Sequence, residues 1–561
     1  MRRRLYAFRL KFNAGYAFWL AVLVPLGVLL FSGTLYETIE LDLLSLVIAA
    51  TAVAALVTYR GRRLAGWIGA AATWIVRHRR PSAAPSDSGV AFTVEPGDRV
   101  ALRWEGDTLV AAVKLIPRPF STTVIVDGRA CTEDVLDTEL LEHLLVVNCP
   151  DLEADVVSAG YRVGRTATRG AVCNYEQLIG RDPAPAHRRT WVVLRADPLR
   201  AQRSALRRDA DVAGLARYLA ASATRIADQL ASHGVDAVCE SGFDDYDEAT
   251  EISFTSEHWS SVEGYGTYTA AYSSPGGPDA WWSVSAARTI TRVRIVCGEA
   301  PRSTVILTTA KKPKRPRGFS PASGGQRDAL SGRILLPDRH QVLPIGSAGV
   351  LVGQTQSDHH RVYLPFDDID ASVTVGDAQT FAQFAARAAA AGGIVTVGSG
   401  FQKFAILIGA ETGSEPKVTW PAATTYLGEQ QGMRSIVLQN DVISIPGHPL
   451  LRIEPFTTPD EIEYQKALPR ANRGGLRLAA NGVRPVQHGA GAEASGAGPA
   501  SNGAGPGGNG AGPGANGAGP GVKLAMPIRA GAVPLGLKPI PGAVPESDDH
   551  DAPPADGKGT P

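Results

Sequence analysis

The chain has 561 residues and a formal net charge of +1 at pH 7. Its hydrophobic share of 44% is typical of a globular protein, whereas 61 Gly and 39 Pro are more than a packed chain needs. Its five Cys lie about 18 or more positions apart, which excludes a disulfide scaffold and a CxxC zinc site.

The net charge averages two unlike parts of the chain. Residues 1–80 contain eleven Lys or Arg and three acidic residues, so their charge is about +8 and that of the remainder is about −7. A general nucleic-acid binder needs a basic surface on its folded part. We therefore expect no nucleic-acid partner and assign the positive charge to a membrane.

Two uncharged runs predict a transmembrane helical hairpin at residues 13–36 and 43–60. The first run is too long for the core of a signal peptide. The segment 1–12 is basic and Arg also follows the second run, whereas the connection 37–42 carries only acidic charges. Because Lys and Arg near membrane helices stay in the cytoplasm, both termini and the main domain are predicted to be cytoplasmic, at the plasma (inner) membrane, with 37–42 as a short acidic extracytoplasmic loop. If the second run were a buried soluble helix, this charge asymmetry would be unexplained.

Apolar side chains at helical spacing predict an amphipathic juxtamembrane helix at residues 61–80. Such a helix lies along the lipid bilayer or docks a partner helix. The alternative is that it continues the second span into the cytoplasm and packs on its own domain. The expected membrane or partner docking residues are Leu64, Trp67, Ile68, Trp74 and Ile75.

After a linker at 81–92, a mixed α/β (α+β) cytosolic region is predicted at 93–480. Apolar and β-branched runs predict strands at 100–104, 108–115, 122–126, 155–158, 190–195, 282–285, 289–296, 303–309, 349–352, 393–397 and 404–408. Periodicity predicts helices at 133–145, capped by Thr132, and at 212–233 and 380–391. Gly and Pro at 273–277 suggest the start of a second unit, but whether the region forms one domain or two is left open.

Five cations crowd the segment Lys311–Arg317. The segment either contacts anionic headgroups of the cytoplasmic leaflet or is a solvated loop. Pro313, Pro316 and Gly318 deny it regular structure in both cases.

Residues 481–561 are predicted to be a disordered Gly/Ala/Pro-rich tail. Asn-Gly-Ala-Gly-Pro-Gly recurs at Asn502, Asn509 and Asn516, and no side chain of this repeat can bury apolar area. A solubilising role and partner binding both fit such a tail.

The sequence lacks the common catalytic signatures: it has no GxxxxGK[ST] loop, HExxH, GxSxG or kinase set. Asp358, His359 and His360, with His340 nearby, are metal-type ligands, but neighbours on a strand point to opposite faces and do not easily share an ion. We therefore predict no catalytic residue, no cofactor and no metal site.

One enzymatic alternative rests on Asp245 and Asp247. Nucleotide-sugar transferases use Asp-x-Asp to hold a divalent cation against a diphosphate, because carboxylates are hard ligands. The pattern also occurs at Asp209 and at Asp368, so it has little specificity. The alternative function is a membrane-anchored, glycosyltransferase-like enzyme acting on a cell-envelope precursor at the cytoplasmic leaflet.

The order of these features resembles the EccE family, a membrane component of the type VII (ESX) secretion systems of mycobacteria and related actinobacteria. The resemblance covers roughly residues 1–410, and the long Gly/Pro tail departs from shorter family members. The matching stretches are Val57–Trp67, Gly106-Asp107 within 100–115, Asp155–Ser158, Thr190–Asp197, Ala216–Gly234 with Arg225, Gly332–Pro337 and Gly349–Gln354.

The resemblance implies a structural subunit, not an enzyme, that supports assembly or stability of an inner-membrane export complex. Its implied neighbours are EccB-, EccC- and EccD-like subunits, of which the EccC-like one is the ATPase. The family's cytosolic domain is somewhat like a glycosyltransferase fold without the catalytic equipment, so the resemblance implies no catalytic residues.

Overall fold

The computed structural model describes residues 8–10, 57–59, 62–79, 92–94 and 100–469, except positions 334, 429, 431, 432, 440, 441, 446, 449, 455 and 456. The predicted tail at 481–561, the first predicted span at 13–36 and most of the second lie outside these residues. Among the helices of the described segments, none has both the length and the apolar character needed to cross a membrane.

A small antiparallel sheet joins three segments near the N-terminus: β1 (Phe8–Leu10), β2 (Val57–Tyr59) and β3 (Arg62–Arg63). The β-branched and aromatic residues of β2 favour a strand. Residues 57–59 are thus a strand, where the sequence predicted the last turn of the second span. The helix α3 (Leu64–Arg79) follows within the range 61–80 where an amphipathic helix was expected.

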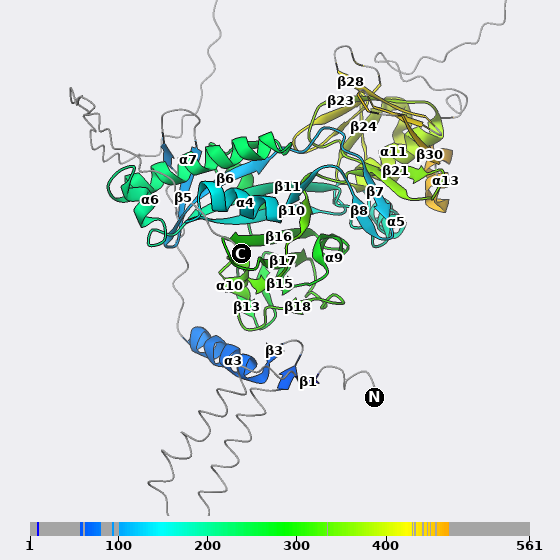
Figure 1. Cartoon of the computed structure of the whole chain (residues 1–561). Helices are drawn as coiled ribbons and strands as arrows, with labels where there is room; N and C mark the ends of the chain where they lie inside the picture. The colour runs from blue at the N-terminus through cyan, green and yellow to red at the C-terminus, as the bar shows by residue number, and fades with distance from the viewer. Residues whose placement is uncertain are drawn as a thin grey trace, which may run out of the picture. The chain divides into compact units, whose positions relative to one another are not determined.

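The body contains a large antiparallel sheet, the first sheet, which runs in the order β13-β14-β15-β17-β16-β10-β11-β6-β5-β4 (Figure 1). Its strands are β4 (Phe92–Val94), β5 (Val100–Glu105), β6 (Thr108–Leu115), β10 (Glu153–Tyr161), β11 (His187–Ala196), β12 (Ala237–Cys239), β13 (Ser256–His258), β14 (Ser261–Gly264), β15 (Thr267–Ser273), β16 (Arg288–Val296), β17 (Arg302–Thr309), β18 (Ser320–Pro321) and β19 (Leu336–Pro337). Strand β12 pairs with β6, β18 with β15, and β19 with β17.

Both faces of the first sheet are covered. The helices α4 (Thr138–Asn148), α7 (Asp211–Ser232) and α9 (Gly277–Trp282) share one apolar core with it, and α6 (Gln202–Leu206) packs beside α7. The short helices α8 (Asp244–Thr250) and α10 (Gln326–Leu330) share the core of the opposite face. Alternate residues of β6 therefore enter different cores, which is why this strand reads as a continuous apolar run.

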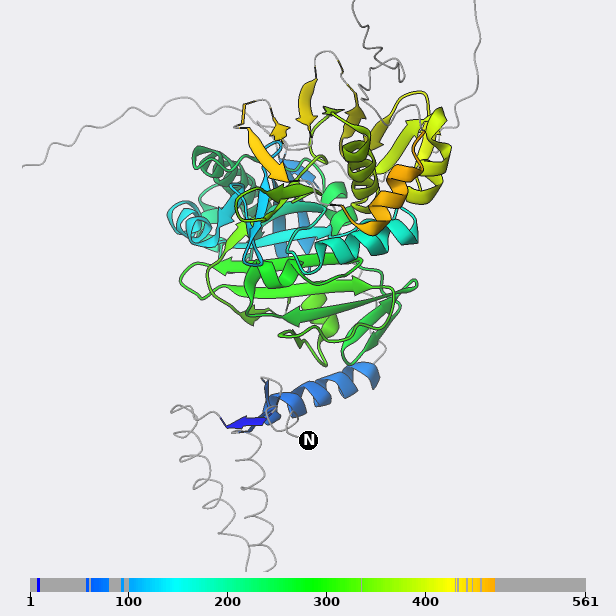
Figure 2. The same ribbon diagram turned by 90° about the vertical axis from the view of Figure 1, so that its right-hand side faces the viewer.

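A second sheet mixes parallel and antiparallel strands, and Figure 2 shows it beside the first. Its strands are β7 (Thr123–Val126), β8 (Arg129–Cys131), β21 (Val350–Thr355), β22 (Arg361–Leu364), β23 (Ala371–Val375), β24 (Ile394–Gly398), β25 (Glu411–Gly413), β26 (Lys417–Thr419), β27 (Thr424–Leu427), β28 (Arg434–Leu438), β29 (Val442–Ser444) and β30 (Leu451–Glu454). Its helical layer is α5 (Arg169–Ile179), α11 (Ala378–Ala390), η2 (Ser399–Phe401), α12 (Gln402–Ile408) and α13 (Pro459–Lys466). Two further strands, β9 (Val135–Asp137) and β20 (Val342–Pro344), pair with each other.

The two sheets belong to one compact unit, residues 1–488. The chain crosses between them more than once, because β7, β8 and α5 come early in the sequence but pack with the second sheet. The expected start of a second unit at 273–277 is wrong, since β15 and β16 flank this turn and both lie in the first sheet.

Three local predictions were also wrong. Helix α4 begins at Thr138, because 135–137 pair as β9 and Asp137 caps the helix by accepting from the backbone N–H of Glu139 at 2.9 Å. Residues 282–285 are not a strand, because helix α9, with Pro278 in its first turn, ends at Trp282 and a turn follows. Residues 404–408 belong to α12, where Phe404 and Ile408, four positions apart, are buried on one side.

Candidate interaction surfaces

Helix α3 contacts the body through a cluster of three Trp. The ring of Trp67 stacks on Trp259 with centroids 6.0 Å apart, and Trp74 meets the same ring edge-on at 5.9 Å. Trp259 lies in the turn between β13 and β14. Aromatic pairs of this kind contribute about 0.5–1.5 kcal/mol each beyond their buried area. Two of the predicted docking residues therefore pack on the chain's own domain.

A neighbouring side of α3, about 100° around the helix from the Trp pair, keeps an apolar edge. Ile68 is 62% exposed and Ile75 is 44% exposed, and the seven-residue spacing places them on the same side of the helix. Leu64 starts the helix, but its side chain is not described. The predicted docking face thus divides into an inward Trp pair and an outward Ile pair.

The Asp-x-Asp motif lies in helix α8, and each carboxylate has its own cation. Asp245 accepts from Lys114 Nζ at 2.8 Å, and Asp247 accepts from Arg103 at 2.7 Å. The hydrogen bond from Lys114 is the main cause that lowers the pKa of Asp245. The two ion pairs hold α8 on the first sheet. They give the motif a structural use.

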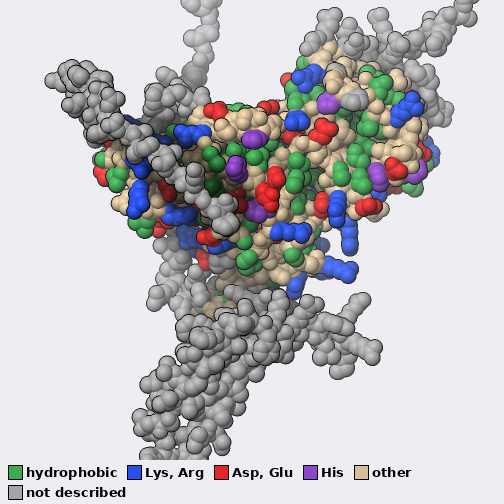
Figure 3. Space-filling view, viewed as in Figure 1, with side chains coloured by type: hydrophobic (Ala, Val, Ile, Leu, Met, Phe, Trp, Pro, Cys, Tyr) green, Lys and Arg blue, Asp and Glu red, His purple; other side chains and the backbone are tan. Residues whose placement is uncertain are grey.

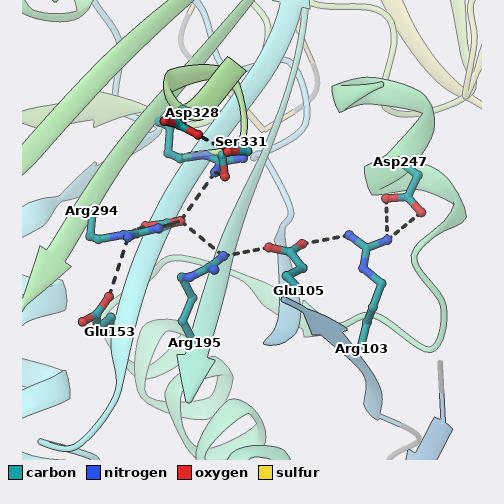
Figure 4. Close-up of polar contacts among 10 residues, drawn as sticks. Arg103, Glu105, Glu153, Arg195, Asp247, Arg294, Asp328 and Ser331 are labelled. Atoms are coloured by element: carbon teal, nitrogen blue, oxygen red, sulfur yellow. Dashed lines mark hydrogen bonds and ion pairs between the residues drawn. The ribbon is translucent and has the colours of Figure 1, made fainter. Parts of the chain in front are cut away.

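Asp247 is the end of a longer network of charges across the first sheet (Figure 4). Arg103 also pairs with Glu105 at 3.0 Å, and Glu105 pairs with Arg195 at 2.8 Å. Arg195 lies 3.8 Å from Asp155, in the middle strand β10. The network therefore runs through β5, β11 and β10 on one face of the sheet.

Asp155 is the most enclosed acid of this network, with its side chain 1% exposed. It accepts two hydrogen bonds from Arg294, at 2.6 and 2.8 Å, and Arg292 lies at 4.0 Å. The register pairs Asp155 with Arg294, which places their side chains on the same face. Burial raises the pKa of Asp155, but the Arg neighbours outweigh it and the net pKa is lowered. The carboxylate is thus charged and neutralised within the fold.

A second polar cluster, which no sequence pattern indicated, joins the first sheet to the chain entering the second. His187 Nδ1 lies 2.5 Å from Asp367, which also accepts from Ser347 at 2.7 Å. Arg188 donates to the carbonyl of Gly346, and burial lowers the pKa of Arg188 to about 10. His187 and Asp367 are 8% and 2% exposed, so this pair fastens two parts of the fold together.

The metal-type residues noted in the sequence do not converge. His359 pairs with Glu454 at 3.1 Å, and His340 pairs with Glu142 at 3.1 Å. Across the described residues, no group of three or more His, Cys, Asp or Glu side chains is arranged to hold a metal ion.

Known proteins match the chain over most of its length. A family model described as "Putative type VII ESX secretion system translocon, EccE" matches residues 184–274, from just before β11 to just past β15. The chain is 58% identical over 462 residues to ESX-1 secretion system protein EccE1 of Mycobacterium tuberculosis strain H37Rv, covering 82% of this chain and 99% of that protein. It is 53% identical over 464 residues to the protein of the same name from Mycolicibacterium smegmatis, covering 82% and 98%.

Proposed function

Because this chain belongs to the EccE family of type VII (ESX) secretion components, we propose that it is a structural subunit of an ESX inner-membrane complex. In this role it supports the assembly or stability of the export machinery and is not itself an enzyme. The observation that carries the proposal is the identity of more than half of 462 aligned residues to ESX-1 secretion system protein EccE1.

The proposed setting is the plasma membrane, with both termini in the cytoplasm. The hairpin that spans it consists of residues 13–36 and 43–56, since 57–59 form strand β2. The charge asymmetry of residues 1–80 supports this orientation. The proposed neighbours are EccB-, EccC- and EccD-like subunits, with ATP hydrolysis supplied by the EccC-like one.

The charge network supports a structural rather than a catalytic body. Its acids and arginines neutralise one another, and both carboxylates of the Asp-x-Asp motif take part in ion pairs. Such networks hold elements in a defined arrangement. A rigid platform is what a scaffold subunit needs.

We propose the outward edge of α3, Ile68 and Ile75, as a docking surface for a neighbouring subunit. Burying two exposed Ile side chains supplies about 2 kcal/mol or more. The Trp pair of α3 is a poor target for a test, because its replacement disturbs the chain's own contact with Trp259.

The test is gentle-detergent extraction of the tagged full chain from its native membrane, followed by a native gel and mass spectrometry. We expect a high-mass complex that contains the EccB-, EccC- and EccD-like subunits. A free monomer or homo-oligomer, in an extract where those subunits still migrate together, would contradict the proposal.

The docking surface is tested in the same assay with Ile68→Ser and Ile75→Ser combined. We expect about thirtyfold less chain in the complex, which corresponds to the loss of about 2 kcal/mol. The matched control is Leu199→Ser with Ile406→Ser, since these residues are 85% and 76% exposed on other parts of the body. An equal loss in both double variants would show that α3 has no special role.

A further inference from the structure

Five of the seven residues from 311 to 317, in the loop between β17 and β18, are cations. They are Lys311, Lys312, Lys314, Arg315 and Arg317, and all five are exposed. No acidic residue lies between Thr309 and Ser320. Among the described acidic side chains, none forms an ion pair with any of the five. This segment is called the basic loop. Its cations lack ion-pair partners among the described residues, whereas every cation of the charge network has an acidic neighbour.

The basic loop is held at its base. Thr309 Oγ1 donates to the carbonyl of Lys311 at 2.7 Å, and Arg315 Nε donates to the carbonyl of Phe319. Phe319 is 2% exposed and packs edge-on against Tyr272, with centroids 5.9 Å apart. The loop therefore presents its cations from a defined place on the first sheet. Figure 3 shows Lys and Arg side chains projecting from this part of the body, near β18 and α9 in the same view of Figure 1.

The chain that follows the basic loop leads to the contact with α3. After β18, the N–H of Gly324 donates to the carbonyl of Trp259 at 2.8 Å. A Cβ on Gly324 would lie 3.2 Å from the carbonyl oxygen of Ala70 in α3 and 2.8 Å from the Trp259 ring. Gly324 thus lies between the Trp259 ring and the helix.

The loop itself also reaches strand β14. The pKa of Glu263 is lowered first by the hydrogen bond from His258 and, more weakly, by the charge of Lys312. The strand register also places the start of the loop here, because Thr309 pairs with Tyr268 of β15 and Tyr268 pairs with Glu263 of β14, the strand that follows Trp259 in the chain. The basic loop and α3 lie at the same end of the first sheet.

From this placement we propose that the basic loop binds the phosphate headgroups of anionic phospholipids in the cytoplasmic leaflet. The inference rests on the proposed membrane hairpin, whose second span ends before β2 begins at Val57. Arg63, the residue before α3, pairs with Thr58 of β2. Two residues span at most about 7 Å and paired strands lie about 5 Å apart, so α3 and the end of the sheet that contacts it stay near the bilayer.

Charge complementarity selects a lipid surface as the occupant. The cytoplasmic leaflet is anionic, and each Lys or Arg near it increases binding about fivefold. Pro313 and Pro316 keep the backbone irregular, so the cations form no helical or strand stripe that a single protein groove would match. A diffuse layer of phosphates requires no such stripe.

The test uses the full chain in nanodiscs of either phosphatidylcholine alone or a mixture with phosphatidylglycerol. A fluorescent amino acid replaces exposed Ala310, beside the loop, and is quenched by a lipid that carries a nitroxide on its headgroup. A second reporter at Ser357, in the turn between β21 and β22, serves as the reference on the second sheet.

The loop variant replaces Lys311, Lys312, Lys314 and Arg317 by Gln and keeps Arg315, which holds Phe319. Its matched control replaces four exposed cations elsewhere in the body by Gln. These are Arg129, Arg203, Arg207 and Lys403.

We expect quenching at position 310 to be at least about threefold stronger in anionic than in neutral nanodiscs. It should fall to the neutral value in the loop variant and in 1 M NaCl, where the screening length is about 3 Å. The control variant and the reporter at 357 should not respond. Quenching that is equal in both lipids, or unchanged in the loop variant, would overturn the proposal. A third outcome is the absence of quenching at 310 together with the loss of neighbouring subunits from native extracts of the loop variant. That result would overturn the lipid proposal in favour of an acidic protein partner.

Failure of the hairpin itself gives a different result. A chain released from membranes by alkaline washing would contradict the proposed membrane spans. Flotation of that released chain with anionic but not with neutral vesicles would still support the loop contact. Flotation with neither would overturn it.

Discussion

Replacing Asp155 by Asn tests whether the charge network stabilises the fold. The substitution keeps the size of the side chain but leaves Arg294 and Arg292, 15% and 10% exposed, without their shared counter-charge. Removing one partner of a buried ion pair costs about 3–5 kcal/mol. Glu105 and Glu153 remain near the arginines, so we expect the lower end, about 3 kcal/mol. For a folded part of this size, that corresponds to a drop in Tm of roughly 4 °C.

The effect should depend on pH in one direction. The pKa of Asp155 is lower in the folded chain than in the unfolded one, so its charge adds stability above the unfolded value of about 4. That stability is lost as the pH falls through the folded value. The difference in unfolding free energy between wild type and Asp155→Asn should therefore be full at pH 7 and shrink below about pH 4.

The assay is urea and thermal unfolding of the purified full chain in mild detergent, followed by Trp fluorescence and circular dichroism. Asp107→Asn is the matched control, because this substitution removes the same charge from the exposed turn between β5 and β6. If the unfolding free energies of Asp155→Asn and Asp107→Asn differ by less than about 0.5 kcal/mol at pH 7, Asp155 behaves like a surface residue and the charge network does not stabilise the fold. A full difference that persists at pH 3 would also refute it.

Three further predictions concern other parts of the fold. Glu461→Gln should destabilise the second sheet's helical layer by about 3 kcal/mol in urea unfolding, because Arg387 is 3% exposed and loses its charged partner; a change under about 0.5 kcal/mol would contradict this. Gly324→Val should detach α3, because a β-branched residue is strained at φ +74 and its side chain meets the Trp259 ring. Protease cleavage near residue 80 should then become at least about threefold faster. An unchanged cleavage rate would argue against this contact. At pH 8 a maleimide should modify exposed Cys173 readily, whereas Cys149, whose burial raises its pKa to about 12, should react only in denaturant; equal rates in the native chain would contradict its burial.

Many elements of the first sheet could be predicted from the sequence, because strands buried on both faces are continuous runs of apolar and β-branched residues. Strands such as 289–296 and 303–309 read as long β-branched runs, and α7 has a clear helical period. Of the misassigned segments, 282–285 alternates apolar residues with Ser and begins at the last residue of α9, and 404–408 is an apolar run inside α12. Over four or five residues, the periods of a strand and a helix are not distinguishable.

The candidate sites were visible in the sequence only as single residues. The pattern of Asp245 and Asp247 is the same whether the carboxylates bind a metal ion or pair with basic side chains. The basic partners are Lys114 and Arg103, which lie more than 130 residues away in the sequence. The spacing within α3 likewise predicts one apolar face. That spacing does not predict that Trp259, almost 200 residues later, packs against the Trp pair and leaves the Ile pair exposed.

Composition and local order along the chain are therefore enough to indicate the family, the mixed α/β body, the charge asymmetry and the existence of the basic loop, because each is a property of neighbouring residues. Only the tertiary structure decided that early strands join the second sheet, that buried charges cancel, and that the basic loop lies at the α3 end of the first sheet. These depend on contacts between segments far apart in the sequence, whose pairing is selected by the burial of whole faces and by the cost of leaving any charge unpaired inside.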